Sequence, residues 1–150
     1  MEVVRLDKDA EENGLAAMLQ GLLAENVAAS EAKRRDLDAI STVFGIVAPD
    51  AEVKVTLVFA RGGCSIHDGL RSDAEVIVTA DSGKIPELSL LSIRYGLPWV
   101  LDDAGQNFLK ALARREVKIR GLVDFPPNWR DTLRRTLDLV RLTRILSVNS

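Results

Sequence analysis

The residues best suited to catalysis lie in the short segment Ser65-Ile66-His67-Asp68, which holds the three residue types of a hydrolytic triad. A triad needs its hydroxyl, imidazole and carboxylate in one line of hydrogen bonds. On a strand, Ser65 and His67 would share one face, about 7 Å apart along the backbone, while Asp68 would point the other way. No strained Gly-x-Ser-x-Gly turn surrounds the serine. The segment therefore favours an ordinary histidine of an edge strand, and a hydrolase would need an acid from elsewhere in the chain.

Two other motifs fail on their spacing. Cys64 and His67 could supply two metal ligands at most, whereas structural zinc takes four, so no metal site is expected. The segment Asp81-Ser82-Gly83-Lys84 ends like a phosphate-binding loop. However, Val78 stands where that loop needs a glycine, and Ile85 stands where it needs Ser or Thr. Helix capping by Asp81 and Ser82 is the better interpretation.

The remaining charged pairs suggest no chemistry. Adjacent carboxylates such as Asp102-Asp103 diverge in most backbone conformations, and Asp103 suits a helix cap. The basic pairs Arg114-Arg115 and Arg134-Arg135 lie among acids without interleaved aromatic residues for stacking on bases. A solvated face is expected for both, with contact to an acidic headgroup or a protein partner as the alternative.

Composition places these residues in one soluble domain over residues 1–150. The chain has a mass of 16.4 kDa, 47% apolar and 28% charged residues, and a net charge of −2, so a nucleic-acid-binding role is not expected. No apolar run is long enough to cross a bilayer, and residues 1–5 do not begin a secretory signal. One cysteine fits a reducing cytoplasm, where we expect the protein to act.

Hydrophobic periodicity predicts the elements of the first half. Asp9 and Glu12 suit a capping pair for a helix whose apolar stripe runs from Leu15 to Val27. Residues 37–47 fit either a helix or a buried strand. Strands are expected over 53–59, 64–68 and 74–80, the first two joined through Gly62-Gly63, which we interpret as an antiparallel meander.

The second half alternates helices with a last strand. A helix is expected from Gly83 to Ile93, an irregular apolar segment over 97–101, and a helix capped by Asp103. A strand follows over 117–121, and Asn128 caps a final helix. That helix carries two apolar stripes on nearly opposite sides. Trp129, Leu133, Leu137 and Val140 form the stripe expected to dock, whereas Leu139, Leu142 and Leu146 need a partner.

At three places the sequence resembles the lipid-binding domain of the sterol carrier protein 2 family. Residues 73–81 resemble its third strand with acidic residues at both ends, and the helix from Ala104 leading into 117–121 resembles its short helix and basic strand. The closing helix ending at 142–146 resembles its C-terminal element. The likeness spans about residues 51–148, which leaves residues 1–50 as an N-terminal helical extension.

The resemblance implies an α/β (α+β) fold with a curved, mostly antiparallel sheet of about five strands backed by helices. It also implies an apolar tunnel for sterols, fatty acids, acyl-CoA or isoprenoid-like lipids, with no catalytic residues and no cofactor. Some members are fused to enzymes or assist the biosynthesis of lipidic cofactors. Residues 147–150 lack the family's peroxisomal address, and the segment 92–103 is longer and more apolar than the family's usual link.

The apolar segment between Ile85 and Leu112 is either plain core or the wall of such a cavity. For a cavity we expect a sheet floor, helical walls, and a lid formed by the irregular segment and the last helix. Arg94 or Arg120 would anchor a carboxylate. The floor includes Val55, and the ligand-contacting residues expected are Leu57, Val76, Val78, Leu88, Leu91, Leu97, Trp99, Val100, Phe108, Leu112, Ile119, Leu133 and Leu137.

The alternative function is a structural or oligomerisation module, or an enzyme accessory, whose cavity is filled by its own side chains. The final helix would then make a homodimer or dock onto an enzyme. The two functions are compatible with each other, and neither requires stable insertion into a membrane.

Overall fold

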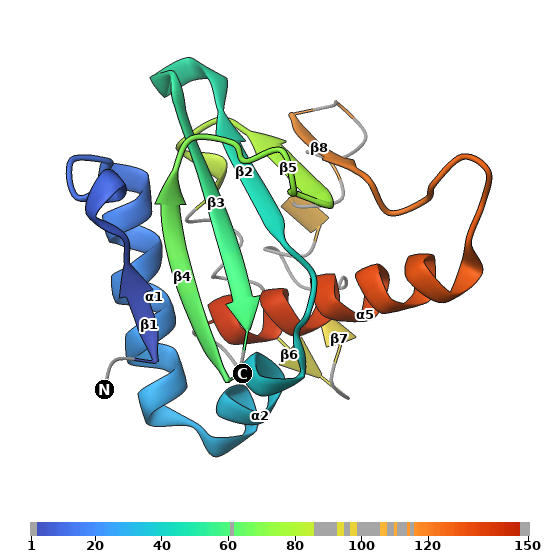
Figure 1. The fold of residues 1–150 in the computed structure, drawn as a ribbon, viewed down its shortest axis with the longest axis horizontal. Helices are drawn as coiled ribbons and strands as arrows, with labels where there is room; N and C mark the ends of the chain where they lie inside the picture. Colours follow the sequence, from blue (N-terminus) through green and yellow to red (C-terminus); the bar gives the residue numbers. More distant parts are fainter. Residues whose placement is uncertain are drawn as a thin grey trace.

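The chain forms an open six-stranded mixed sheet with helices packed on one face (Figure 1). The computed structural model describes residues 3–60, 62–85, 93–94, 97–98, 106–107, 110, 114 and 116–147. Strand order in the sheet is β1-β4-β3-β2-β5-β8. Three of its five strand pairs are antiparallel, and β1–β4 and β2–β5 are parallel. The α/β fold class is confirmed, with one strand more than expected.

The strands are short and their bounds follow the alternating apolar pattern. The sheet comprises β1 (Val4–Leu6), β2 (Phe44–Ala48), β3 (Val53–Ala60), β4 (Gly63–Asp68), β5 (Val76–Ala80) and β8 (Val117–Arg120). A separate two-stranded ladder joins β6 (Ile93–Arg94) to β7 (Leu97–Pro98). Gly62, with φ +74°, provides the left-handed residue of the β3–β4 hairpin, as the Gly-Gly pair predicts.

The expected meander is wrong beyond its first hairpin. β5 pairs with β2 in parallel, with Phe44 opposite Val76, and does not pair with β4. β4 is not an edge strand either, because the three-residue β1 pairs along its other side. Hydrophobic periodicity predicted neither β1, the neighbour of β4, nor β2, the neighbour of β5. β1 is too short to show a pattern, and β2 lies in the ambiguous segment 37–47.

The described helices are α1 (Gly14–Ala29), α2 (Glu31–Ala39) and α5 (Trp129–Leu146), with one-turn 3-10 helices at Lys8–Ala10 and Pro49–Ala51. Asn13 caps α1, accepting a hydrogen bond from the Ala16 N–H. Asp9 therefore does not cap this helix, because it lies in the preceding 3-10 turn. Asn128 caps α5 as predicted, accepting from the N–H groups of Arg130 and Asp131 at 3.2 and 3.4 Å.

The core lies between the inner face of the sheet and these helices. α1 buries Leu19 and Leu23 completely or nearly so, and α5 buries Ile145. Phe44 of β2 and Phe59 of β3 pack edge to face, with ring centroids 6.1 Å apart. The first fifty residues contain the expected helices, but they also supply β1 and β2, so a purely helical extension is an incomplete description.

Parts of the connection from β5 to β8 are described. Lys84 and Ile85 are helical, which agrees with a helix starting near Gly83. The prediction that this helix ends at Ile93 is wrong, because Ile93 lies in strand β6. Leu97, which was expected in an irregular segment, lies in strand β7. The helix capped by Asp103 lies largely outside the described residues. No helix in the described part of the chain is long and apolar enough to span a bilayer.

Gly121 gives a test of how tightly β8 ends against β5. Its φ is +91°, and a Cβ added there would lie 1.9 Å from the carbonyl oxygen of Glu75. We expect Gly121→Ala to lower the free energy of unfolding by about 2 kcal/mol or more, since left-handed strain and a backbone clash act together. Urea denaturation would measure this.

Gly21→Ala is the matched control, because nothing lies within 4 Å of a Cβ added at this position in α1. This change should stabilise the chain by about 0.5–1 kcal/mol. Equal effects of the two substitutions would contradict the close approach at Gly121.

Candidate functional site

The inner face of the sheet brings together the predicted floor residues. In the strand register, Phe44 lies between Leu57 and Val76, and Val78 lies opposite Ile119. Leu57 and Val76 have none of their surface exposed and Val78 has 7%, whereas Ile119 is half-buried. Val55 lies on the same face and is fully buried. The shared face is confirmed, while ligand contact stays a prediction.

The predicted wall residues lie outside the described part of the chain. For the side chains of Leu88, Leu91, Leu97, Trp99, Val100, Phe108 and Leu112, and for the side chain of Arg94, no placement is described. Arg120 is described and is opposite Ile77. It alternates with Ile119 along β8, so it projects from the outer face and cannot anchor a ligand on the inner floor.

The orientation of α5 is the reverse of the expected one. Leu142 and Ile145 are buried, whereas Leu133 is 61% exposed and Leu137 is 44% exposed. The structure therefore does not bring Leu133 and Leu137 over the floor as a lid. Trp129, also predicted to dock, is 72% exposed. The stripe that periodicity left without a partner is the one that packs.

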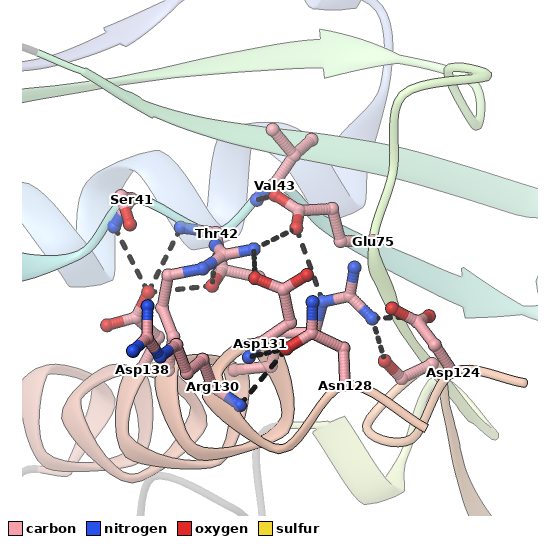
Figure 2. Close-up of polar contacts among 12 residues, drawn as sticks. Ser41, Thr42, Val43, Glu75, Asp124, Asn128, Arg130, Asp131 and Asp138 are labelled. Carbon is pink, nitrogen blue, oxygen red and sulfur yellow. Dashed lines mark hydrogen bonds and ion pairs between the residues drawn. The ribbon is translucent and has the colours of Figure 1, made fainter. Parts of the chain in front are cut away.

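A buried carboxylate explains this orientation. Asp138 of α5 is completely buried, and its Oδ2 accepts hydrogen bonds from the backbone N–H of Ser41 and Thr42 and from the Thr42 hydroxyl, at 3.1, 3.1 and 2.7 Å (Figure 2). Arg141 pairs with its Oδ1 at 2.7 Å. A buried charge without partners is strongly unfavourable, so α5 must turn this side toward the segment leading into β2.

Glu75, just before β5, extends the same network. Its carboxylate pairs with Arg134 at 2.5 Å and with Arg135 at 3.3 Å. Arg135 also bonds the Gly121 carbonyl and Asp124, and Arg134 donates to the Thr42 hydroxyl. The basic pair on α5 was expected to be a solvated face, and that prediction is wrong. We call Thr42, Glu75, Arg134, Arg135 and Asp138 the α5 clasp.

The clasp has a defined charge state. Burial alone would raise the pKa of Glu75, but hydrogen bonds from Arg134, the Val43 N–H and Arg135 outweigh it and lower the pKa below the ordinary 4.5. Hydrogen bonding to Glu75 raises the pKa of Arg134, and hydrogen bonding to Asp124 raises that of Arg135. Glu75, Arg134 and Arg135 are therefore ionised partners at neutral pH.

On the opposite face of the sheet, Ser65 and His67 do meet an acid. The Ser65 Oγ lies 2.9 Å from His67 Nε2, and His67 Nδ1 lies 3.6 Å from the Asp7 carboxylate. In the tautomer that carries its proton on Nδ1, Nε2 would accept a hydrogen bond from the Ser65 hydroxyl. Asp7 follows β1, so only the missed strand pairing could reveal it.

The same cluster has features that limit catalysis. At 3.6 Å the His67–Asp7 contact is too long for a hydrogen bond. The guanidinium of Arg71 lies 3.5 Å from His67 Nε2. Asp9 adds a second carboxylate, because an oxygen of Asp7, an oxygen of Asp9 and a ring nitrogen of His67 all lie within 4.8 Å of one another. A hollow of about 430 Å³ near the end of β4 is lined in part by Asp9 and Asp68, and neither Ser65 nor His67 lines it.

Cys64 points away from this cluster. It pairs with Phe59 on the inner face, and burial raises the pKa of its thiol to about 12. A neutral thiol on the opposite side of the sheet from His67 cannot share a metal with it. A second described groove, about 360 Å³, lies between β1 and α1 and is lined by Val3, Val4, Gln20, Ala24, Val27, Ala28 and Arg34. None of these residues was predicted to bind a ligand.

Solved structures with the same arrangement are sterol-carrier-like. The chain superposes on a UbiJ-SCP2 ubiquinone synthesis protein with a TM-score of 0.55 and 16% identity, over 89% of this chain and 96% of that one. It superposes on sterol carrier protein 2 with a TM-score of 0.50 and 16% identity, over the same shares. No family model and no curated protein matches the sequence. The chain thus has the sterol carrier protein 2 fold.

The α5 clasp predicts a dependence of stability on acid. Because folding lowers the pKa of Glu75, its contribution is present above the unfolded-state value near 4.5 and is lost as pH falls through the folded-state pKa. Glu75→Gln should lower the free energy of unfolding by about 1.5 kcal/mol near neutral pH. The difference in unfolding free energy between the variant and the wild type should shrink as the pH falls below 4.5, as measured by urea denaturation at each pH.

Glu25→Gln, at an exposed position of α1, serves as the control and should leave the free energy of unfolding within about 0.5 kcal/mol of the wild type. A gap for Glu75→Gln that stays constant over this pH range would contradict the ionised clasp.

Proposed function

We propose that the chain binds an apolar ligand without converting it chemically. The ligand class is a fatty acid, acyl-CoA, sterol or isoprenoid-like lipid. Its site would lie against the inner face of β5 and β8. The observation that supports this most directly is the uninterrupted apolar floor of Val76, Val78 and Ile119 at that end of the sheet.

The placement of the helices supports the same site. α1 and α2 contact the sheet at β3 and β4, and α5 is attached near the starts of β2 and β5 through its polar side. The proposed ligand would lie against the inner face at β8, on the side of the sheet away from β3 and β4. Two proteins with this fold are a ubiquinone synthesis protein and a sterol carrier protein, and ubiquinone and sterols are apolar molecules.

Burial of hydrocarbon would drive binding. Each methylene removed from water contributes about 0.8 kcal/mol, so a long acyl chain contributes on the order of 10 kcal/mol before ordering costs. The proposal places this activity in the cytoplasm. Any homodimer or enzyme partner would use α5, whose exposed residues fit the alternative role as an oligomerisation or accessory module.

Native mass spectrometry followed by organic extraction distinguishes the two roles. A lipid retained at about one per chain supports the binding function, whereas an empty chain that also fails to bind a fluorescent fatty acid supports the module. The same spectrum reports whether the protein is a dimer.

Substitution of Ile119 tests the location of the site. Ile119→Asn places an amide on the apolar floor and should weaken binding of a fluorescent fatty acid by about tenfold or more. Lys118→Asn is the matched control, because Lys118 is the preceding residue and pairs with Thr79 on the outer face. Equal affinity of both variants would place the ligand elsewhere, for example in the groove between β1 and α1.

Ester hydrolysis at Ser65, His67 and Asp7 is a second candidate, supported by the 2.9 Å serine–histidine contact. We expect hydrolysis of a p-nitrophenyl ester by the wild type to be no faster than by His67→Ala or Ser65→Ala. Loss of about a hundredfold or more in rate with either variant, and a smaller loss with Asp7→Asn, would establish the hydrolase and contradict a purely binding role.

A further inference from the structure

Three side chains with metal-binding atoms meet on the outer face of the sheet, at the edge where β1 pairs with β4. An oxygen of Asp7, an oxygen of Asp9 and a ring nitrogen of His67 lie within 4.8 Å of one another. Asp7 and His67 are half-buried, whereas Asp9 is exposed, so an ion can reach the group from solvent. The proposed binding of an apolar ligand uses none of these three side chains.

Backbone hydrogen bonds on both sides of His67 hold the two carboxylates next to its ring. The Asp7 N–H donates to the Ile66 carbonyl at 2.9 Å and continues the pairing of β1 with β4. The Asp68 N–H donates to Asp9 Oδ1 at 3.1 Å, and Asp9 lies in the 3-10 turn that follows Asp7. The sheet edge therefore brings together side chains from distant parts of the sequence, which spacing along the chain did not predict.

The distance between His67 and Asp7 fits two ligands of one metal ion better than it fits a hydrogen bond. His67 Nδ1 and Asp7 Oδ2 are 3.6 Å apart, which exceeds hydrogen-bonding range. Two ligands of a tetrahedral zinc ion are about 3.4 Å apart, since bonds of about 2.0–2.1 Å meet near the tetrahedral angle. Any three atoms within 4.8 Å of one another share a point at most about 2.8 Å from each. Side-chain shifts of less than about 1 Å therefore bring all three atoms to bonding distance.

The second ring nitrogen of His67 has the partner that a metal-bound histidine needs. Nε2 lies 2.9 Å from the Ser65 Oγ. With a metal on Nδ1, the ring proton is on Nε2 and is donated to this hydroxyl, which fixes the orientation of the ring. Arg71 also faces Nε2, at 3.5 Å, and its guanidinium is paired with both oxygens of Asp73.

Charge and atom type indicate the class of ion. Two carboxylates balance the charge of a divalent cation, and an imidazole favours zinc and its neighbours over magnesium or calcium, which prefer oxygen ligands. The hollow near the end of β4 shares Asp9 with the group and is also lined by Glu12, Glu52 and Asp68. Lys54 is the one Lys or Arg among the residues that line it. These acidic surroundings attract cations toward the group.

We propose that Asp7, Asp9 and His67 bind one divalent transition-metal ion of the zinc type. His67 binds through Nδ1, each carboxylate supplies one oxygen, and water completes the four ligands that zinc takes. The ion joins the turn after β1 to β4. Because Nε2 then carries the ring proton, it cannot accept a proton from Ser65, so metal binding and ester hydrolysis at Ser65 exclude each other.

Isothermal titration calorimetry with zinc chloride tests the site, using the full chain without a polyhistidine tag. The wild type should bind one zinc ion per chain, and His67→Ala and Asp7→Asn should each weaken binding by about tenfold or more. Glu11→Gln is the matched control, because Glu11 is an exposed carboxylate at the end of the same 3-10 turn and lies outside the group. This variant should bind zinc like the wild type, and excess magnesium should not displace the zinc.

The chain has a single histidine, which allows a second measurement that needs no substitution. The imidazole nitrogen signals in the NMR spectrum of an isotope-labelled chain come from His67 alone, and zinc should shift Nδ1 and leave the proton on Nε2. Unchanged imidazole signals, zinc on Nε2, or undiminished binding by both His67→Ala and Asp7→Asn would overturn the proposal.

The metal site goes beyond the proposed function and can be tested separately from it. The group lies on the opposite face of the sheet from the apolar floor, so His67→Ala should bind a fluorescent fatty acid with wild-type affinity. Zinc binding by a chain that binds no fatty acid would support the metal site and reject the proposed function. Fatty-acid binding without zinc binding would do the reverse.

Discussion

The burial of Asp138 against the segment that leads into β2 is the contact on which the arrangement of α5 depends. This carboxylate is fully enclosed, and the N–H groups of Ser41 and Thr42 complete its hydrogen bonds. Removing one partner of a buried ion pair lowers the free energy of unfolding by about 3–5 kcal/mol, whereas the intact pair adds little net stability. The main effect of the buried carboxylate is to fix which side of α5 faces the sheet.

This orientation has consequences at both ends of α5. At its C-terminal end, Leu142 and Ile145 enter the core, and Asn26 of α1 donates to the carbonyls of Ile145 and Leu146. At its N-terminal end, Arg134 and Arg135 bind Glu75 beside β5. Because Asp138 and the stripe that includes Leu142 face inward, Trp129, Leu133 and Leu137 on the other side of the helix face outward. These exposed apolar residues and the apolar sheet floor are thus two separate surfaces that follow from one set of contacts.

The two faces of the sheet also differ in chemistry. The inner face carries branched aliphatic and aromatic side chains and a thiol that burial keeps protonated. Polar groups, including Ser65 and His67, project from the outer face. Among the described residues, the buried apolar side chains of the sheet thus lie mainly on the inner face, and the serine–histidine contact lies on the outer one. The sterol carrier protein 2 fold therefore provides distinct locations for the binding and hydrolytic candidates.

The sequence by itself determined the elements that depend on residues close together in the chain, such as turns, helix caps and strands with alternating apolar residues. The β3–β4 hairpin follows from alternation around Gly62-Gly63, and the start of α5 follows from the Asn128 cap. The shared face of Val78 and Ile119 follows from a period of two once β5 and β8 pair. Order and spacing also sufficed for the resemblance to the sterol carrier fold, which the superpositions confirm.

Only the tertiary structure decided the pairings between distant segments. Residues 4–6 form a strand because they pair with β4. The same pairing places Asp7 beside His67. α5 exposes Trp129 and Leu133 because Asp138, Arg134 and Arg135 find partners at Thr42 and Glu75, some sixty to one hundred residues away. Hydrophobic periodicity ranks faces by apolar content alone. It therefore does not detect a carboxylate such as Asp138, whose buried hydrogen bonds decide which side of the helix faces the sheet.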